Sequence, residues 1–145
     1  MTKHWESVNV FFQILPGTPQ KLFLMAGIND VSHDLSTDSV VSLITKVIEK
    51  IQTESPRTKL YIQSLLPINE SFGRYKTMTG KTDLIPEINR KLEALAKEKK
   101  ISFIHLFPLF TEKNSNVMRK ELTTDGLHLT EEGYRIWSKA LKRYL

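Results

Sequence analysis

Two short stretches of the sequence combine side chains that could do chemistry. Asp125 and His128 stand three residues apart in an Asp-Gly-Leu-His stretch. In a turn, a carboxylate at this spacing can accept a hydrogen bond from the imidazole Nδ1–H, which fixes the tautomer and leaves Nε2 free to act as a base. Asn29, in a Gly-Ile-Asn-Asp stretch, could aim its side-chain N–H groups at a developing oxyanion. Each motif alone also fits an ordinary turn or a local structural hydrogen bond.

The elements that must position these groups follow from the apolar pattern. Three short apolar runs predict buried strands: 21–26, 59–66 and 101–107. Apolar residues at helical spacing predict helices in three places: 37–51 with a cap at Ser36 or Thr37, the segment after Pro86, and the segment after Thr130. Strands that alternate with helices predict parallel βαβ units. We therefore expect an α/β fold of three layers, α/β/α, with a parallel sheet.

Both candidate motifs should lie at the same rim of that sheet. Ligands bind at the C-terminal ends of parallel strands, and Asn29 directly follows the strand 21–26. His128 stands just before the last helix, which is expected to bury four residues: Tyr134, Trp137, Ala140 and Leu141. The longest irregular stretch, 69–83, is either a binding loop or a plain surface excursion.

The opening segment can be interpreted in two ways. Trp5, Val8, Phe11, Phe12 and Leu15 keep helical spacing, while the stretch 8–14 also suits a strand. A helix is favoured, because Pro16 and Gly17 would end it.

Length and composition set wider limits. The chain has 145 residues, of which 40% are hydrophobic and 26% charged, and its formal net charge is +5. This balance excludes a disordered or fibrous chain, and no apolar run approaches the about 18 residues that span a membrane. The absence of cysteine excludes disulfides, a thiol nucleophile and a thiolate zinc site. We expect residues 1–145 to form one domain.

Neither metal nor nucleic-acid binding is indicated. The histidines, at 4, 33, 105 and 128, have no ligand spacing, so no metal and no cofactor is expected. The basic residues of the helices have no interleaved aromatic motif, so no nucleic-acid partner is expected. The first seven residues lack the apolar core of a secretory signal, which suits a cytoplasmic protein. The protein would be exported if a signal peptide was lost with a missing N-terminal part.

Together, in this order and on these elements, the motifs resemble the SGNH (GDSL-type) hydrolase superfamily of esterases and acylhydrolases. Residues 27–30 match its Gly-x-Asn-Asp block and residues 125–128 its Asp-x-x-His block, while 63–67 and 129–134 are also similar. The chain resembles most the branch of acetylhydrolases similar to platelet-activating-factor acetylhydrolase. The resemblance implies that Asn29 is an oxyanion-hole donor, His128 the general base and Asp125 its orienting partner. It also implies hydrolysis of O-acetyl or short acyl esters of a lipid or carbohydrate.

Two further blocks that the resemblance implies are not in this sequence. One carries the nucleophile in a Gly-Asp-Ser turn after the first strand, and the other supplies a glycine N–H to the oxyanion. Only 26 residues precede Gly27, and none matches either block. Ser7 falls in the expected opening helix, and capping explains Asp38 and Ser39 at a helix start. We therefore expect an inactive, N-terminally truncated domain whose sheet lacks its first strand.

A missing first strand also predicts association. The flavodoxin-like strand order that the resemblance implies places that strand beside 21–26, so its loss would expose an apolar sheet edge. Either 8–14 forms a replacement strand or another chain covers the edge. We expect a homo-oligomer through this edge or a poorly soluble monomer. The alternative function is therefore that of a non-catalytic remnant acting as an oligomerising interaction module.

Overall fold

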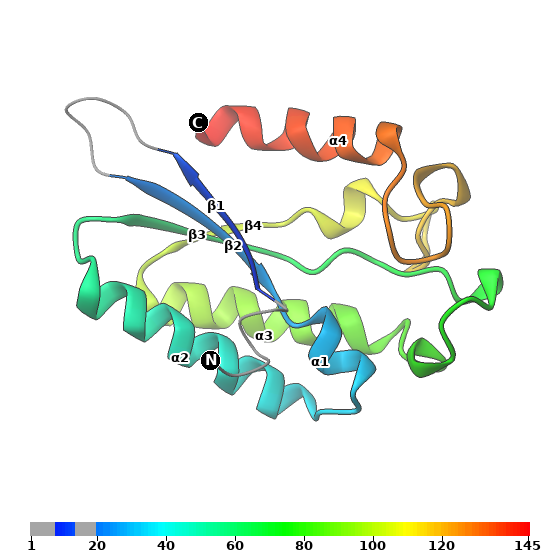
Figure 1. Ribbon diagram of the computed structural model, residues 1–145, viewed down its shortest axis with the longest axis horizontal. Coiled ribbons are helices and arrows are strands. Elements are labelled where there is room, and N and C mark those ends of the chain that lie inside the picture. Colours follow the sequence, from blue (N-terminus) through cyan, green and yellow to red (C-terminus); the bar gives the residue numbers. More distant parts are fainter. Residues whose placement is uncertain (1–7, 14–19) are drawn as a thin grey trace.

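The chain folds around a four-stranded sheet (Figure 1). The computed structural model describes residues 8–13 and 20–145. The strands lie in the order β1-β2-β3-β4, with these bounds: β1 Val8–Gln13, β2 Lys21–Ala26, β3 Lys59–Gln63 and β4 Ser102–Ile104. Strands β2, β3 and β4 pair in parallel, and β1 pairs with β2 in the antiparallel direction. The predicted parallel sheet is therefore confirmed.

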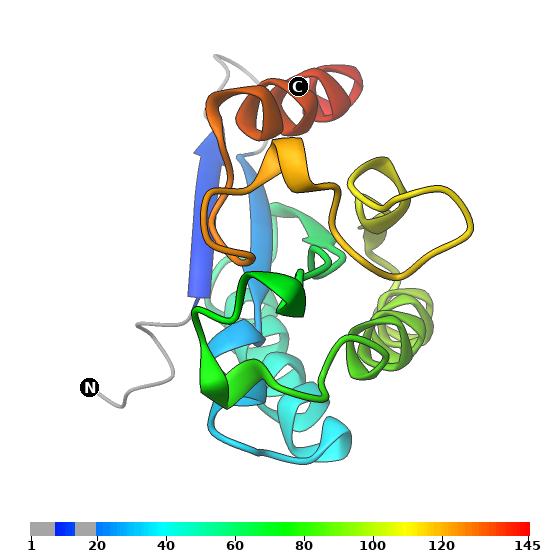
Figure 2. The ribbon, with the colours of Figure 1, turned by 90° about the vertical axis from the view of Figure 1, so that its right-hand side faces the viewer.

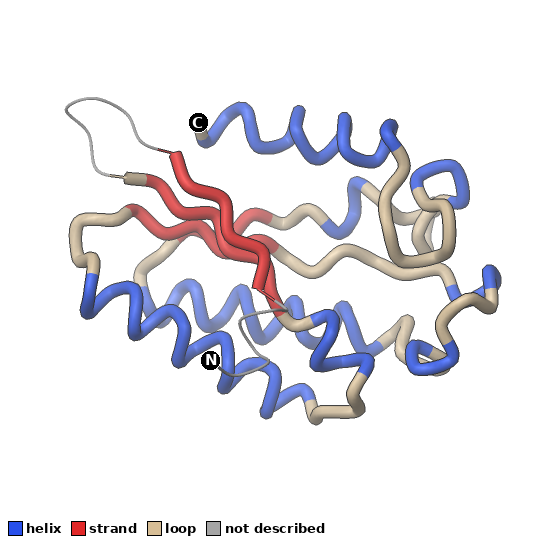
Figure 3. The backbone as a smooth tube through the Cα atoms, viewed as in Figure 1, coloured by secondary structure: helices blue, strands red, loops and turns tan. Residues whose placement is uncertain are grey.

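Helices cover both faces of this sheet (Figures 1 and 3). On one face lie α1 (Ile28–Ser32), α2 (Thr37–Glu54) and α3 (Leu84–Lys99), and on the other lies α4 (Glu131–Leu141). Short 3-10 helices punctuate the loops: η2 Glu70–Phe72, η3 Lys76–Met78, η4 Phe107–Leu109, η5 Lys120–Leu122 and η6 Lys142–Tyr144. The three-layer α/β/α fold is thus as predicted. No helix among the described residues is long and apolar enough to cross a bilayer.

Local sequence signals explain where the helices begin. The Ser36 hydroxyl accepts a hydrogen bond from the Ser39 N–H at 3.1 Å and caps α2. The Thr130 hydroxyl caps α4 in the same way, through the Gly133 N–H. Helix α3 begins at Leu84, two residues before the expected proline. Pro86 is tolerated there because the first-turn N–H groups of a helix have no intrahelical partner.

Strands β3 and β4 end earlier than the apolar pattern predicts. Beyond β3, the backbone of Leu65 pairs with the buried Asn89 side chain, through N–H to Oδ1 at 2.7 Å and C=O to Nδ2 at 3.1 Å. Beyond β4, the N–H groups of Leu106 and Phe107 both donate to the Ser64 hydroxyl at 3.0 Å. Side chains therefore satisfy buried backbone groups that a longer ladder would otherwise pair.

The opening segment differs from the prediction. Residues Val8–Gln13 form strand β1, not a helix, in a register that runs from Val8↔Ala26 to Gln13↔Lys21. The bare edge of β2 offers backbone N–H and C=O groups that a neighbouring strand can pair and a helix cannot. Chain-internal pairing therefore covers the β2 edge, which was the first of the two alternatives. The rest of the expected helix, including Trp5, Ser7 and Leu15, lies outside the described residues.

The side chains of α4 are less buried against the sheet than predicted. Phe23 and Tyr61 stack there with ring centroids 4.6 Å apart, and Tyr144 packs edge-on against Tyr61. On α4 itself only Gly133 is buried, and Tyr134 is 54% exposed rather than inward. The helix approaches closely at its glycine, since a Cβ on Gly133 would lie 2.9 Å from the Leu122 carbonyl oxygen. Trp137, Ala140 and Leu141 are half-buried.

Candidate active site

A sharp turn after β2 places Asn29 at the C-terminal end of the sheet. Gly27 has φ +119°, and a Cβ there would lie 2.9 Å from Val40 Cγ1, so the position requires glycine. The chain enters α1 at once, and the Asn29 backbone carbonyl accepts hydrogen bonds from Ser32 and His33. These contacts hold the backbone of Asn29, while its exposed side chain lies along a pocket.

The Asp125–His128 turn has the geometry that its spacing suggests. The Asp125 Oδ2 atom lies 2.7 Å from His128 Nδ1. The other oxygen, Oδ1, accepts the backbone N–H groups of Leu127 at 2.9 Å and His128 at 2.8 Å. The Thr123 hydroxyl donates to the His128 carbonyl at 2.6 Å and accepts from the Gly126 N–H at 2.9 Å. The turn therefore orients the imidazole so that Nδ1 faces the carboxylate.

The surroundings keep Asp125 ionised. Burial by itself would raise the pKa of Asp125. Hydrogen bonds from the backbone and side chain of His128, from the Leu127 N–H and from Tyr75 outweigh burial and hold that pKa well below its usual range. The carboxylate is thus charged at neutral pH and available to the imidazole.

A tyrosine that the sequence did not single out joins this pair. The Tyr75 hydroxyl donates to Asp125 Oδ2 at 3.0 Å and lies 3.4 Å from His128 Nδ1. The hydrogen bond to Asp125 raises the pKa of Tyr75, with burial adding to the effect. Tyr75 belongs to the long loop 69–83, the candidate binding loop, but nothing in its sequence context distinguishes it from an ordinary loop tyrosine.

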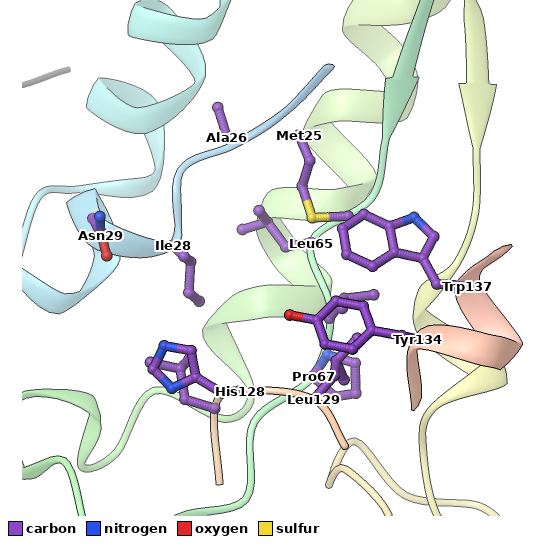
Figure 4. A pocket seen from close by; sticks show the side chains of 12 residues that line it. Met25, Ala26, Ile28, Asn29, Leu65, Pro67, His128, Leu129, Tyr134 and Trp137 are labelled. Atoms are coloured by element: carbon purple, nitrogen blue, oxygen red, sulfur yellow. The ribbon is translucent and has the colours of Figure 1, made fainter. Parts of the chain in front are cut away.

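A pocket of about 510 Å³ opens where these elements meet, and Figure 4 shows its lining. Asn29, Ile28 and His128 lie along one side and Tyr134 and Trp137 of α4 along the opposite side. The remaining lining residues are apolar: Met25, Ala26, Leu65, Leu66, Pro67, Leu127 and Leu129. Among the described residues that line it, none is a serine or a threonine.

The aromatic wall of the pocket was also missed by the sequence analysis. The Trp137 indole N–H donates to the buried Gln63 side-chain oxygen at 2.7 Å, which fixes the ring against β3. Tyr134 lies nearly parallel to Trp137, with ring centroids 6.1 Å apart and planes at 13°. The helical spacing of Tyr134 and Trp137 predicts a buried face. The low burial of α4 in the structure shows that this face is the wall of a pocket and not part of the core.

The structure thus brings the predicted groups together in a defined way. His128 and Asn29 line one pocket, and Asp125 lies behind His128, outside the pocket lining. Ser39 lies at the start of α2 in contact with Ser36, as expected of a capping residue. His105 lies apart from the pocket, next to Phe103. In the described part of the chain, no three His, Cys, Asp or Glu side chains are grouped to hold a metal ion.

Comparison with known proteins places the chain among hydrolases. Residues 3–136 match the model of the GDSL-like lipase/acylhydrolase family. The chain is similar to a structure from Streptococcus pneumonia described as a platelet activating factor, with 30% identity and a TM-score of 0.79 over 86% of this chain and 58% of that one. It is also similar to a GDSL-like lipase from Bacteroides thetaiotaomicron, with 26% identity and a TM-score of 0.73 over 84% of this chain and 60% of that one.

An acetyl xylan esterase, AlAXEase, is similar at 25% identity and a TM-score of 0.62, over 85% of this chain and 65% of that one. This chain therefore spans less than two thirds of the length of these proteins, between 58% and 65%. The search of curated proteins gave no match. Because the family model covers residues 3–136, the chain belongs to the GDSL-like lipase/acylhydrolase family, a group of SGNH hydrolases.

Proposed function

We propose that the pocket is the site of an ester hydrolase that acts on O-acetyl or short acyl esters of a lipid or carbohydrate. His128 is the general base, Asp125 orients it, and Asn29 donates to the oxyanion. The observation that carries the proposal is that the Asp125-held imidazole and Asn29 line one pocket at the C-terminal ends of β2 and β3. Family membership supports an ester as the substrate.

The proposed reaction uses these groups in turn. Asp125 fixes the Nδ1–H tautomer of His128, so that Nε2 takes the proton from an attacking hydroxyl. The hydroxyl oxygen bonds to the ester carbonyl carbon, and Asn29 donates to the oxyanion that forms. The intermediate collapses, the C–O bond to the alcohol breaks, and Nε2–H returns the proton to the departing alcohol. Water then releases the acyl group by the same route.

The attacking hydroxyl is assigned outside the described pocket lining, because that lining holds no serine or threonine. The resemblance to the family implies that this hydroxyl belongs to the serine of a Gly-Asp-Ser turn. Residues 1–145 do not contain this tripeptide. Loss of the nucleophile costs about 10⁶ in turnover in a well-studied serine protease. We therefore propose that this chain supplies the base and the oxyanion donor and by itself turns over esters about 10⁶-fold more slowly than a site that holds its nucleophile.

The walls of the pocket suit the acyl side of such a substrate. Met25, Leu65 and Trp137 offer apolar surface next to His128. Each buried methylene contributes about 0.8 kcal/mol to binding. Esters whose acyl group has a few carbons are therefore expected to bind better than acetyl esters.

A substrate-analogue titration tests the proposal without turnover. Ethyl methylphosphonate carries a tetrahedral anion that resembles the intermediate of ester hydrolysis. Its addition should shift the NMR signals of the His128 imidazole and the Asn29 side-chain amide, and Asn29→Ala should weaken binding. His105→Ala, away from this pocket, is the control. Shifts that spread evenly over the protein, or none at all, would contradict an ester site.

A turnover measurement tests the assignment of the hydroxyl. Hydrolysis of p-nitrophenyl acetate by this chain should match that of His128→Ala. A rate that depends on His128 and exceeds the background by orders of magnitude would show that this chain supplies its own attacking group, either a hydroxyl or the imidazole itself. The ester site would then stand, and the assignment of the nucleophile elsewhere would be wrong.

A further inference from the structure

The carboxylate of Asp125 has more donors than an orienting partner of a histidine requires. Oδ1 accepts two backbone N–H groups, from Leu127 and His128. Oδ2 accepts from the Tyr75 hydroxyl at 3.0 Å and lies 2.7 Å from His128 Nδ1. The tyrosine therefore binds the same oxygen atom that faces the imidazole. A change at Tyr75 acts directly on the acceptor of the Asp125–His128 hydrogen bond.

The hydroxyl of Tyr75 also restricts which atom carries the proton on the imidazole. It lies 3.4 Å from His128 Nδ1, the longer of its two contacts. Because its single proton goes to Asp125 Oδ2, it has none left to donate to Nδ1. The imidazole then keeps its own proton on Nδ1, directed at the carboxylate. Nε2 stays free on the pocket side, as a general base requires.

The loop that carries Tyr75 is itself held firmly. The Glu70 carboxylate accepts the N–H groups of Gly80 at 2.7 Å and Thr82 at 3.2 Å, and also the Thr82 hydroxyl, which closes the loop across its base. These bonds lower the pKa of Glu70, the Thr82 hydroxyl contributing most, so the closure persists at neutral pH. Between Gly80 and Thr82, Lys81 Nζ pairs with Asp34 at 2.6 Å.

The same loop is fixed to the turn that carries Asp125. The Asn69 N–H donates to the Gly126 carbonyl at 2.8 Å, next to the Tyr75–Asp125 contact. Figure 2 shows the loop 69–83, in green, beside the orange turn. The space between them is only about 10 Å³, which is at most enough for one water. Tyr75 therefore meets Asp125 from a braced and closely packed segment.

We propose that Tyr75 is a positioning residue of this site, which clamps Asp125 Oδ2 against the His128 imidazole. The inference rests on the proposed function for its catalytic meaning, but the clamp is a physical claim about three side chains. It extends the site from the two sequence motifs to the long loop between β3 and α3. Loop and turn then act together to set the orientation of the base.

Exchange of the His128 Nδ1–H proton with water measures the clamp. Tyr75→Phe keeps the ring and removes only the hydroxyl, so the Asp125–His128 bond should open more often. The exchange rate should rise about fivefold, the factor that corresponds to one ordinary hydrogen bond of about 1 kcal/mol. Tyr144→Phe is the matched control, since Tyr144 packs on Tyr61 and its carbonyl accepts from Lys21 at the start of β2, the end of the strand opposite to the site. In Tyr144→Phe, the exchange rate of the His128 Nδ1–H proton should stay within about twofold of wild type.

A second measurement tests the contact from the side of the tyrosine. The pKa of Tyr75 is raised mainly by its hydrogen bond to Asp125. Arg74 acts in the opposite direction and is unchanged in the test variant. Asp125→Asn removes the charged acceptor, so carbon NMR of the Tyr75 ring should show ionisation at a lower pH than in wild type.

The outcomes separate the clamp from the function. An unchanged exchange rate in Tyr75→Phe, an equal rise in Tyr144→Phe, or no Nδ1–H signal in wild type would overturn the clamp. So would a Tyr75 titration that does not respond to Asp125→Asn. None of these measurements uses a substrate. If they succeed while the phosphonate fails to bind, the clamp stands and the ester site is wrong.

Discussion

Gln63 and Trp137 join the sheet to α4 beside the pocket. The Gln63 side-chain oxygen, at the end of β3, accepts the Trp137 indole N–H at 2.7 Å. Gln63 is 3% exposed, so its amide has little access to water. Trp137 also lines the pocket. One hydrogen bond therefore contributes both to the stability of the fold and to the shape of the proposed acyl site.

Gln63→Leu should destabilise the protein, because it leaves the half-buried indole N–H without its partner. We expect a loss of about 1 to 3 kcal/mol in the free energy of unfolding, measured by urea denaturation. The double variant Gln63→Leu with Trp137→Phe removes both polar groups and should recover much of that loss. If the double variant is as unstable as the sum of the two single ones, the residues are not coupled.

Gly126→Ala should disturb the turn that carries His128. Gly126 has φ +93°, and a Cβ there would lie 2.3 Å from the Asn69 carbonyl oxygen. Backbone strain of about 1 to 2 kcal/mol adds to about 1 to 3 kcal/mol for the forced displacement, so the expected loss of stability is about 2 to 5 kcal/mol. Urea denaturation measures the loss.

Gly80→Ala is a matched control for this variant. Gly80 also has positive φ, at +80°, but nothing lies within 4 Å of the added Cβ. It should lose only the strain of about 1 to 2 kcal/mol and leave the His128 imidazole signals in place. Equal losses of stability in Gly126→Ala and Gly80→Ala would show that the close contact between loop and turn does not contribute to stability.

The sequence predicted those parts of the fold that depend on local pattern. The apolar run that ends in Gly27 and the capped amphipathic α2 were found where expected. Burial on one or both faces requires apolar residues at regular spacing, and this spacing is visible in the local sequence. The Asp125–His128 contact was also foreseeable, since both partners lie in one turn.

Features that depend on distant partners could not be predicted in this way. β1 is a strand because the edge of β2 lies next to it, although its spacing also suits a helix. Strands β3 and β4 end where Asn89 and Ser64 take over the backbone hydrogen bonds. Tyr75 reaches Asp125 across 50 residues of sequence, a contact to which no short motif points.

The sequence analysis predicts association through the edge of β2, which β1 covers in the structure. We now expect association through the outer edge of β1 instead. β1 covers β2, and its own outer edge has no partner strand among the described residues. Its sequence, VNVFFQ, contains no charge and no proline, the usual protections of an edge strand. We expect sedimentation to show self-association that rises with concentration, and Asn9→Lys to weaken it. A wild-type chain that stays monomeric throughout would contradict association through this edge.

Asp125 should make the stability of the protein depend on pH in the acid range. Hydrogen bonds hold its folded-state pKa below the about 3.9 of an unfolded aspartate. As pH falls, the unfolded chain therefore binds more protons than the folded one, and the stabilisation that is complete above about pH 5 is progressively lost below it. Asp125→Asn lacks this ionisation and should be less stable than wild type by about 1 to 3 kcal/mol at neutral pH. The gap should close as the pH falls, in urea denaturation measured at a series of pH values.

Asp34→Asn provides the control for this pH dependence. Its side chain is 83% exposed and pairs with Lys81 at the surface, where an ion pair contributes about 0 to 1 kcal/mol. Asn also tolerates the left-handed backbone of this position, where φ is +63°. Its pH profile should run close to that of wild type. A gap between wild type and Asp125→Asn that stays constant down to about pH 3 would mean that the carboxylate gains nothing from its four donors in the folded state.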